Sequence, residues 1–323
     1  MQKEKVAVLG GGTMGPGIAT SYALQGSLVA IYSRSQKTLE RAKTVIASNL
    51  QLFVEEEVIT EESAKAAFSR LTFTDSVETA VEGAWYIAET IVENPEAKKT
   101  LYEQLDAILP EDVIIASNTS YMNIFELMPE ARKPYSVIAH WYAPAHILPL
   151  VEVVKGPDTQ EAVMDAVMEF HKACGKTPIR MEKYIPGFIV NRMQSAMNRE
   201  VYYLIENGYC TPEELDLAVK TSLMPRGMIL GLVQRLDFTG LDMMANSIQN
   251  KKFTPAPELD RPSMIFDHTD KGEYGVKNGK GFFDYSPQNY EDVLRQRDKM
   301  LIESVGLADK FLKNPLHDHE KRC

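Results

Sequence analysis

Residues 6–18, Val6-Ala-Val-Leu-Gly-Gly-Gly-Thr-Met-Gly-Pro-Gly-Ile18, join a short apolar run to a glycine turn and the start of a helix. Gly10, Gly12 and Gly15 have the G-x-G-x-x-G spacing. That spacing gives a sharp turn, lets the backbone approach a pyrophosphate, and lets the helix pack closely on its strand. The helix is expected to close at Gly26, and a second apolar run follows it, which completes a βαβ unit. The stretch favours dinucleotide binding over an ordinary glycine-rich turn.

The composition of the chain indicates a globular protein that binds a small molecule. The chain has 323 residues, which is long enough for two domains, and 44% of them are hydrophobic and 25% charged, as in a globular protein. A net charge of −10 argues against nucleic-acid and anionic-membrane partners, because both require a basic face. Cys174, Cys210 and Cys323 lack the spacing of a disulfide framework or a metal site. We expect a cytoplasmic protein without a signal peptide, a membrane span or a metal.

Strands and helices are expected to alternate up to Ile185, whereas only helices are expected from Pro186 onward. One helix is expected to start at Asp158 with a capping box to Glu161. The predicted fold class is α/β: a Rossmann-type doubly wound sheet in residues 1–185, followed by an all-α C-terminal domain in residues 186–323. The other expected strands are residues 28–32, 71–73, 85–89, 113–116, 136–139, 150–154 and 177–180, and the other expected helices are 37–53, 60–71 and 95–109.

A polar stripe lies on the first helix of the C-terminal domain, which is expected to end at Gly208. Its residues are Asn191, Gln194, Ser195 and Asn198, which fall on one helical face. Buried polar groups need partners, so the stripe lines a substrate site, forms a buried network or makes a dimer contact. The pattern leaves these alternatives open.

Two residues have the chemistry of an acid–base pair. His140 ends one expected strand, and Glu152 lies within the next. A hairpin-like loop would bring Glu152 back beside His140, where its carboxylate would orient the imidazole and make it more basic. Oxidation of an alcohol needs an acceptor for the hydroxyl proton, and histidine titrates near neutral pH. The spacing alone also fits a structural histidine at a strand end.

Six segments, in consistent order over roughly residues 4–286, resemble the 3-hydroxyacyl-CoA dehydrogenase family. The resemblance implies a catalytic His140 oriented by Glu152, with Ser120 and Asn191 contacting the oxygen of the substrate. It also implies a helical second domain that mediates dimerisation. The six segments are the glycine turn, Glu89–Asn94 with Lys98, Ser117–Ser120, His140–Glu152, Pro186–Arg192 and Gly279–Tyr285.

The same resemblance places a nicotinamide cofactor on the first domain. Glu93 and Lys98 would lie near the nicotinamide ribose. The full set of expected cofactor-binding residues is Gly10, Gly12, Thr13, Met14, Gly15, Ser33, Arg34, Glu93, Lys98 and Asn118.

Three departures from the family pattern affect what the chain would bind. The family commonly has His-Phe-Phe-Asn-Pro, whereas this chain has Ala143 in place of the asparagine, which removes a hydrogen bond to the site. Ser33 and Arg34 replace the acidic residue that holds the ribose hydroxyls, which weakly favours NADP(H) among NAD(P)(H). The acidic run Glu55–Glu57 stands where members that hold coenzyme A often carry lysine.

The leading hypothesis is an NAD(P)-dependent dehydrogenase that interconverts 3-hydroxyacyl and 3-ketoacyl groups, with His140 and Glu152 as the acid–base pair. An alternative is a dehydrogenase of a free small hydroxy acid, similar to the carnitine and sugar-acid relatives. An alternative of another class is a dinucleotide-binding protein without turnover. The joint presence of Ser120, His140, Glu152 and Asn191 argues against the last, because a binding protein needs no proton acceptor.

Overall fold

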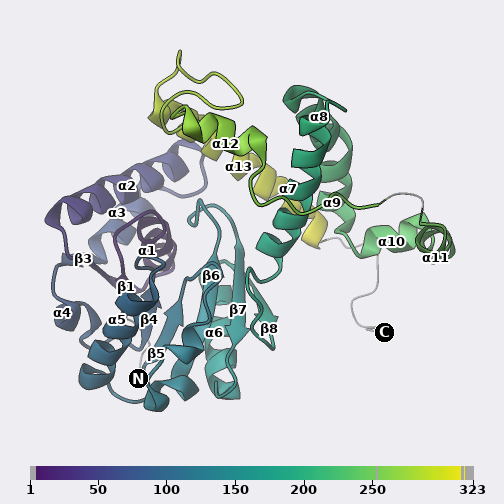
Figure 1. The fold of residues 1–323 in the computed structure, drawn as a ribbon. Helices are drawn as coiled ribbons and strands as arrows, with labels where there is room; N and C mark the ends of the chain where they lie inside the picture. The colour runs from purple at the N-terminus through teal and green to yellow at the C-terminus, as the bar shows by residue number, and fades with distance from the viewer. Residues whose placement is uncertain (1–4, 252–253, 314–315, 317–323) are drawn as a thin grey trace. The chain divides into compact units, whose positions relative to one another are not determined.

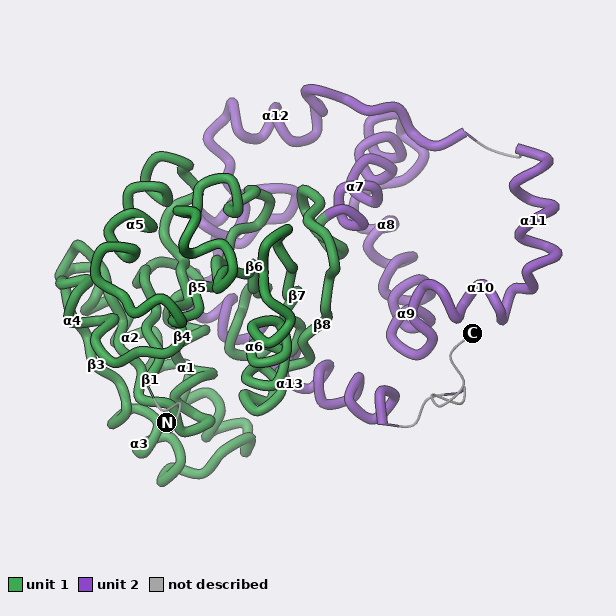
Figure 2. The backbone as a smooth tube through the Cα atoms, turned by 90° about the horizontal axis from the view of Figure 1, so that it is seen from below, with its two compact units in different colours: residues 1–191 green, residues 192–323 purple. Residues whose placement is uncertain are grey.

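The structure is a computed structural model that describes residues 5–251, 254–313 and 316. The chain divides into two compact units, Met1–Asn191 and Arg192–Cys323 (Figures 1 and 2). The elements of the first unit are β1 Lys5–Leu9, α1 Gly15–Leu24, β2 Leu28–Tyr32, α2 Gln36–Glu55, α3 Glu61–Ser69, β3 Leu71–Thr74, α4 Val77–Val81, β4 Tyr86–Glu89, α5 Pro95–Ile108, β5 Ile114–Ser117, β6 Ser136–Trp141, β7 Leu150–Lys155, α6 Glu161–Ala173 and β8 Thr177–Met181.

The eight strands form one sheet in the order β3-β2-β1-β4-β5-β6-β7-β8. The neighbouring strands run parallel except for β6 and β7, which run antiparallel. After β3 the chain crosses to the other side of β1 to begin β4. This reversal makes a topological switch point, where the carboxyl ends of β1 and β4 leave room for a ligand. The doubly wound α/β sheet predicted from the sequence is confirmed.

Both faces of the sheet are covered, because successive residues of each strand point to opposite sides. Val6 and Val8 of β1 pack in one core with side chains from α1, α2, α3 and α6. Ala7 and Leu9 pack in the other core with side chains from α4 and α5. The purely apolar runs in the sequence therefore mark strands that are buried on both sides.

The start of α6 differs from the prediction. The N-cap is Gln160, without a side-chain capping bond, so the predicted capping box from Asp158 is wrong. The Thr159 hydroxyl instead donates to the Ser136 carbonyl oxygen (2.7 Å) and accepts from the Gly156 amide (2.9 Å). These contacts, together with the Thr159 amide donating to the Gly156 carbonyl oxygen at 3.4 Å, hold residues 156–159 in a turn that precedes the first helical turn.

The glycine turn is closed by contacts that exclude larger residues at two positions. Gly10 has φ +131°, and a Cβ atom there would lie 2.5 Å from the Thr90 carbonyl oxygen. A Cβ atom on Gly15 would lie 1.8 Å from the carbonyl oxygen of Gly10. A Cβ atom on Gly12, by contrast, would meet no protein atom within 4 Å. The fold itself therefore requires the first and third glycines, and leaves the second open to whatever approaches the turn.

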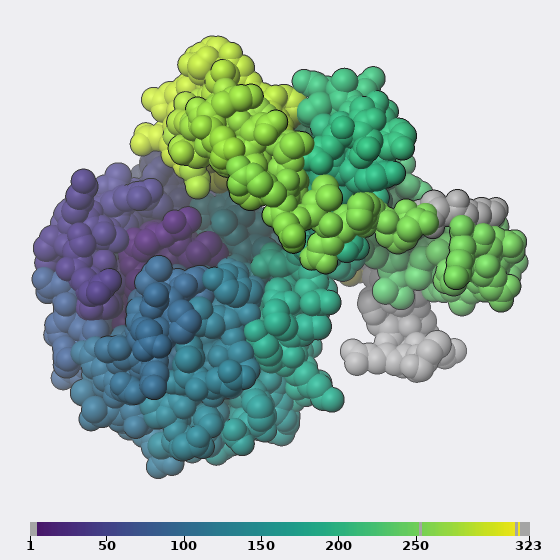
Figure 3. All heavy atoms as spheres, viewed as in Figure 1, coloured from purple at the N-terminus to yellow at the C-terminus, as the bar shows by residue number. Residues whose placement is uncertain are grey.

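The second unit is helical, as predicted. None of its described helices contains a fully buried residue, and several large apolar side chains of α10 and α11 are mostly exposed. Figure 3 shows the atoms of this unit in green to yellow. Its elements are α7 Val190–Glu206, which starts in the first unit, α8 Pro212–Ala218, the π-helical turn η3 Val219–Leu223, α9 Met224–Leu230, α10 Gln234–Thr239, α11 Leu241–Gln249, α12 Ser263–Asp270 and α13 Tyr290–Lys313.

The polar stripe on α7 lies open rather than within a core. Gln194 and Ser195 are exposed, while Asn191 and Asn198 are half-buried. The Gln194 amide donates to Asn198 Oδ1 at 2.8 Å. The stripe is therefore not a buried network, and the substrate-wall and dimer-contact alternatives stay as predictions.

None of the described helices combines the length and the apolar character needed to cross a bilayer.

Candidate active site

The antiparallel pairing of β6 and β7 brings His140 and Glu152 together. The two residues are direct partners in the strand register. His140 Nδ1 lies 2.9 Å from Glu152 Oε2, and both side chains are buried. The hairpin expected from the sequence is confirmed. With Nδ1 turned to the carboxylate, Nε2 is the ring nitrogen that does not face Glu152.

Glu152 is bound by four hydrogen-bond donors. Oε2 accepts from His140 and from the Tyr142 hydroxyl (2.7 Å). Oε1 accepts from the backbone amides of Ile189 (2.9 Å) and Val190 (3.0 Å). Burial raises the pKa of Glu152, but these hydrogen bonds outweigh it and hold the pKa below its usual value. The carboxylate stays charged, and it also fixes the first residues of α7, next to Asn191.

Tyr142 is a member of the site that the sequence analysis missed. Its ring meets the His140 ring edge-on, with centroids 4.6 Å apart, while its hydroxyl binds Glu152. Burial raises the pKa of Tyr142, and the charge of Glu152 raises it further, so the phenol stays protonated and donates. The signal in the sequence was a hydroxyl at the second aromatic position of the motif that begins at His140.

Ser120 and Asn118 lie at the carboxyl end of β5. The Ser120 amide donates to Glu93 Oε1 at 2.5 Å, and its hydroxyl has no hydrogen-bond partner within the described chain. Asn118 Oδ1 accepts from the Trp141 amide at 2.7 Å, directly after His140. Asn118 was expected to bind cofactor, and here its side chain fixes the end of β6.

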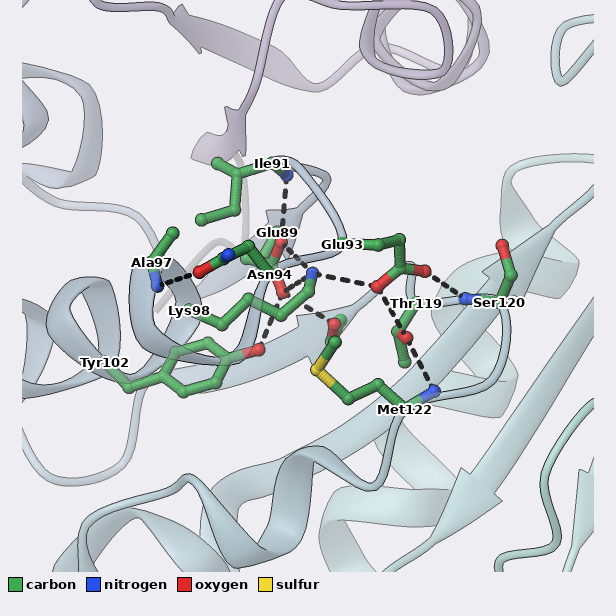
Figure 4. A network of polar contacts seen from close by, with 11 residues as sticks. Glu89, Ile91, Glu93, Asn94, Ala97, Lys98, Tyr102, Thr119, Ser120 and Met122 are labelled. Carbon is green, nitrogen blue, oxygen red and sulfur yellow. Dashed lines mark hydrogen bonds and ion pairs between the residues drawn. The ribbon is translucent and has the colours of Figure 1, made fainter.

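A buried ion pair lies where β4 ends (Figure 4). The Glu89 side chain is fully buried, and both of its oxygens lie within 2.9 Å of Lys98 Nζ. Tyr102 and Ser117 also donate to Glu89, each at 2.6 Å, and the Ile91 amide donates at 2.9 Å. These donors together stabilise the buried charge of Glu89, and the loss of any one of them would leave that charge less well compensated.

Glu93 links this ion pair to the turn that carries Ser120. Lys98 Nζ lies 3.8 Å from Glu93 Oε2, and the Thr119 hydroxyl donates to the same oxygen at 2.9 Å. Lys98 is 1% exposed, and its ammonium pairs with the carboxylates of Glu89 and Glu93. Lys98 and Glu93, both expected near the nicotinamide ribose, thus form a support for Ser120 in this structure (Figure 4).

The residues around the glycine turn fit a dinucleotide. Gly12 and Thr13 are exposed, and α1 begins with no side-chain cap on its free amides, Met14 being the N-cap. Helix N-termini of this kind bind phosphate. The Ser33 Cβ lies 3.4 Å from the place that a Cβ on Gly11 would take, so the end of β2 adjoins the turn. Arg34, the next residue, is exposed.

Comparison with known proteins identifies both units. Residues 5–184 match the family described as 3-hydroxyacyl-CoA dehydrogenase, NAD binding domain. Residues 187–285 match the 3-hydroxyacyl-CoA dehydrogenase, C-terminal domain.

Three relatives are similar over most of their length. A 5-formyl-3-hydroxy-2-methylpyridine 4-carboxylate 5-dehydrogenase from Mesorhizobium japonicum is 30% identical, covering 93% of this chain and 96% of its own. A probable 3-hydroxybutyryl-CoA dehydrogenase from Bacillus subtilis is 31% identical, covering 88% and 98%. An L-carnitine dehydrogenase from Streptomyces griseus is 30% identical, covering 95% and 91%.

A solved structure shares the fold across both units. It is a 5-formyl-3-hydroxy-2-methylpyridine 4-carboxylic acid 5-dehydrogenase, described as an NAD+ dependent dismutase. Its TM-score is 0.84 at 28% identity, with 95% of this chain and 98% of that chain covered. The chain is thus an NAD-dependent oxidoreductase that belongs to the 3-hydroxyacyl-CoA dehydrogenase family.

Proposed function

We propose that the protein interconverts a secondary 3-hydroxyl and a 3-keto group, with His140 as the acid–base residue and Glu152 as its orienting partner. The buried hydrogen bond between His140 Nδ1 and Glu152 Oε2 carries the proposal. When bound, the nicotinamide accepts or supplies the hydride. In oxidation His140 Nε2 takes the hydroxyl proton, and in reduction it returns that proton to the developing alkoxide. Ser120 and Asn191 donate to the oxygen in either direction.

The acyl group is carried by coenzyme A in the first form of this proposal, which the family assignment supports. A free hydroxy acid is a second candidate, and a specific feature favours it. Glu55 and Glu57 are exposed at the connection between α2 and α3, where they would repel a ligand that carries several phosphates. The names of the Mesorhizobium and Streptomyces relatives describe substrates without coenzyme A.

Turnover of matched substrate pairs separates these candidates. We expect oxidation of 3-hydroxybutyryl-CoA, followed at 340 nm, and would compare it with free 3-hydroxybutyrate and with L-carnitine. The double variant Glu55→Lys and Glu57→Lys should lower the KM for the thioester several-fold by removing repulsion, about 1 kcal/mol, and leave a free acid unaffected. Rates on free acids alone would establish the second candidate. Saturable cofactor binding with no rate on any of these substrates would indicate a binding protein without turnover.

We further propose that NADP(H) is accepted and favoured over NAD(H). Ser33 and Arg34 follow β2 in place of an acidic residue, and the guanidinium of the exposed Arg34 would pair with a 2′-phosphate. Arg34→Ala should raise the KM for NADPH about tenfold, equivalent to one charge-assisted hydrogen bond, and leave the KM for NADH unchanged. The measurement is the ratio of kcat/KM for the two cofactors. A preference for NADH that Arg34→Ala does not alter would contradict the proposal.

The helical unit is proposed to form a homodimer. The consecutive helices α10 and α11 carry four large apolar side chains that are each at least 62% exposed, Phe238, Leu241, Met243 and Ile248. Large exposed apolar surface marks an interface. Light scattering after gel filtration should give a molecular mass of about twice the 36.3 kDa of one chain. Phe238→Asp should shift the protein toward monomer. Val92→Asp, at an equally exposed apolar residue of the first unit, is the matched control and should leave the mass unchanged.

The cellular setting that we propose is the cytoplasm. Cys174 and Cys210 are free cysteines, as expected for a protein in a reducing compartment. Cys323 lies outside the described residues.

A further inference from the structure

Two donors share one oxygen of the dyad carboxylate. His140 Nδ1 lies 2.9 Å from Glu152 Oε2, and the Tyr142 hydroxyl donates to the same oxygen at 2.7 Å. The other oxygen, Oε1, is taken by the amides of Ile189 and Val190. The Glu152 carboxylate is fully buried, so the phenol and the imidazole share Oε2 without a water molecule as a third donor.

Competition for Oε2 affects the two protonation states of His140 differently. An imidazolium draws most of its stabilisation from the negative charge on the oxygen that it faces. A phenol that donates to the same oxygen withdraws part of that charge. Tyr142 therefore makes the charged form of His140 less favourable than Glu152 would make it alone, while leaving the tautomer of the neutral ring unchanged.

We propose that Tyr142 is a positioning residue of the dyad, which divides the charge of Glu152 between its hydroxyl and the His140 ring and so sets the pH at which His140 takes up a proton. The inference deepens the proposed function and rests on the dyad described there. The sequence supports the choice of residue, because the family motif commonly has phenylalanine, which cannot donate, at this position.

The groups that face or adjoin His140 come from four places. β7 supplies the charge of Glu152, and the residue following β6 supplies the titratable phenol of Tyr142. The segment before α7 supplies the ring of Phe188, with its centroid 5.1 Å from that of His140, and two uncharged amides. The end of β5 supplies Asn118, a neutral side chain that accepts from the amide of Trp141, the residue after His140. The phenol is thus the group whose removal changes the charge available to His140 without removing the dyad.

The test is an NMR titration of the histidine rings, which needs neither substrate nor turnover. Protein labelled with ¹³C and ¹⁵N at histidine is titrated from pH 5 to pH 9, with the His140 signal assigned by its loss in His140→Gln. In Tyr142→Phe the midpoint of His140 should rise by about half a unit to one unit, the effect of one hydrogen bond on a charged acceptor. Tyr142→Met, which lacks both hydroxyl and ring, should move it in the same direction.

Tyr184→Phe is the matched control. The Tyr184 hydroxyl also donates a single hydrogen bond, at 2.6 Å, but to the backbone carbonyl oxygen of Tyr121. Its ring packs on Phe188, so it borders the same neighbourhood without contacting Glu152. This variant should lose a comparable amount of stability and leave the His140 midpoint unchanged.

The outcomes separate this inference from the proposed function. A rise of the midpoint in both Tyr142 variants, and not in Tyr184→Phe, supports the positioning role. An unchanged or lower midpoint in Tyr142→Phe overturns it, whatever the activity. If the midpoint rises but no 3-hydroxy substrate turns over, the proposed function fails and the positioning role stands. With turnover, the acidic limb of kcat/KM for oxidation should move to higher pH by the same amount, because oxidation requires neutral His140.

Discussion

His140→Gln is expected to lower kcat by a factor of about 10² to 10⁴, the usual contribution of a positioned acid–base group. Glutamine keeps a polar side chain of similar length but cannot take up the proton. The glycine turn is untouched, so the dissociation constant of NADPH or NADH, measured by nicotinamide fluorescence, should stay nearly constant. The measurement is kcat in both directions, corrected for the folded fraction.

Glu152→Gln should lower kcat by a similar factor, and the double variant should lower kcat little more than the worse of the two single variants. Glu152 acts through His140, and residues that share one task lose activity non-additively. His268→Gln is a control, because His268 Nδ1 lies 2.6 Å from Glu273 Oε2 in a partly exposed His–Glu pair of the second unit. The kcat of this variant should stay unchanged.

Two results would contradict this assignment. One is a double variant in which the two losses multiply, which would mean that the residues act independently. The other is a His140→Gln protein that unfolds more easily but whose folded fraction keeps its kcat. In either case His140 would be a structural histidine, and the proton would take another route.

Lys98→Met is expected to lower the free energy of unfolding by about 3–5 kcal/mol, the cost of leaving a buried charge without its partner. Glu89 is fully buried, and both of its oxygens are bound by Lys98. Methionine fills the space of the lysine stem, so the loss is that of the charge rather than of packing. Urea unfolding, followed by circular dichroism, measures the change.

Two further variants give this prediction its contrast. Adding Glu89→Gln to Lys98→Met removes the stranded charge and should recover a large part of the loss. Lys65→Met breaks an exposed pair with Glu61, at 3.1 Å, and should cost less than about 1 kcal/mol. A Lys98→Met protein as stable as Lys65→Met would show that Glu89 becomes protonated or hydrated at little cost, and the buried pair would then have no structural importance.

Most strands of the sheet could be predicted from the sequence because they are short apolar runs bounded by turn residues, whereas β3 and β8 carry polar residues and are partly exposed. The start of α6 could not be predicted, because the Thr159 hydroxyl donates to the carbonyl oxygen of Ser136, which is 23 residues away in the sequence. The short helix α4, Val77–Val81, was also missed. Five residues are too few to display a helical period.

The site was predictable where it depends on residues close in the sequence. His140 and Glu152 belong to one hairpin, so their pairing follows from strand order. The amides of Ile189 and Val190 reach Glu152 from 37 and 38 residues away, which no local pattern shows. The position of Lys98 was anticipated but its contacts were not, because the sequence does not show which nearby carboxylate takes up its charge.

The antiparallel pairing of β6 and β7 has a consequence for how the enzyme can diversify. The ladder that aligns His140 with Glu152 is set by strand pairing, and beyond Tyr142, whose hydroxyl binds Glu152, the connection over residues 143–149 joins the two strand ends. Insertions or substitutions in that connection alter its contour without sliding one strand past the other. The alignment of His140 with Glu152 is therefore independent of the length and sequence of residues 143–149. Relatives that differ in this segment can keep the same pairing of the two residues.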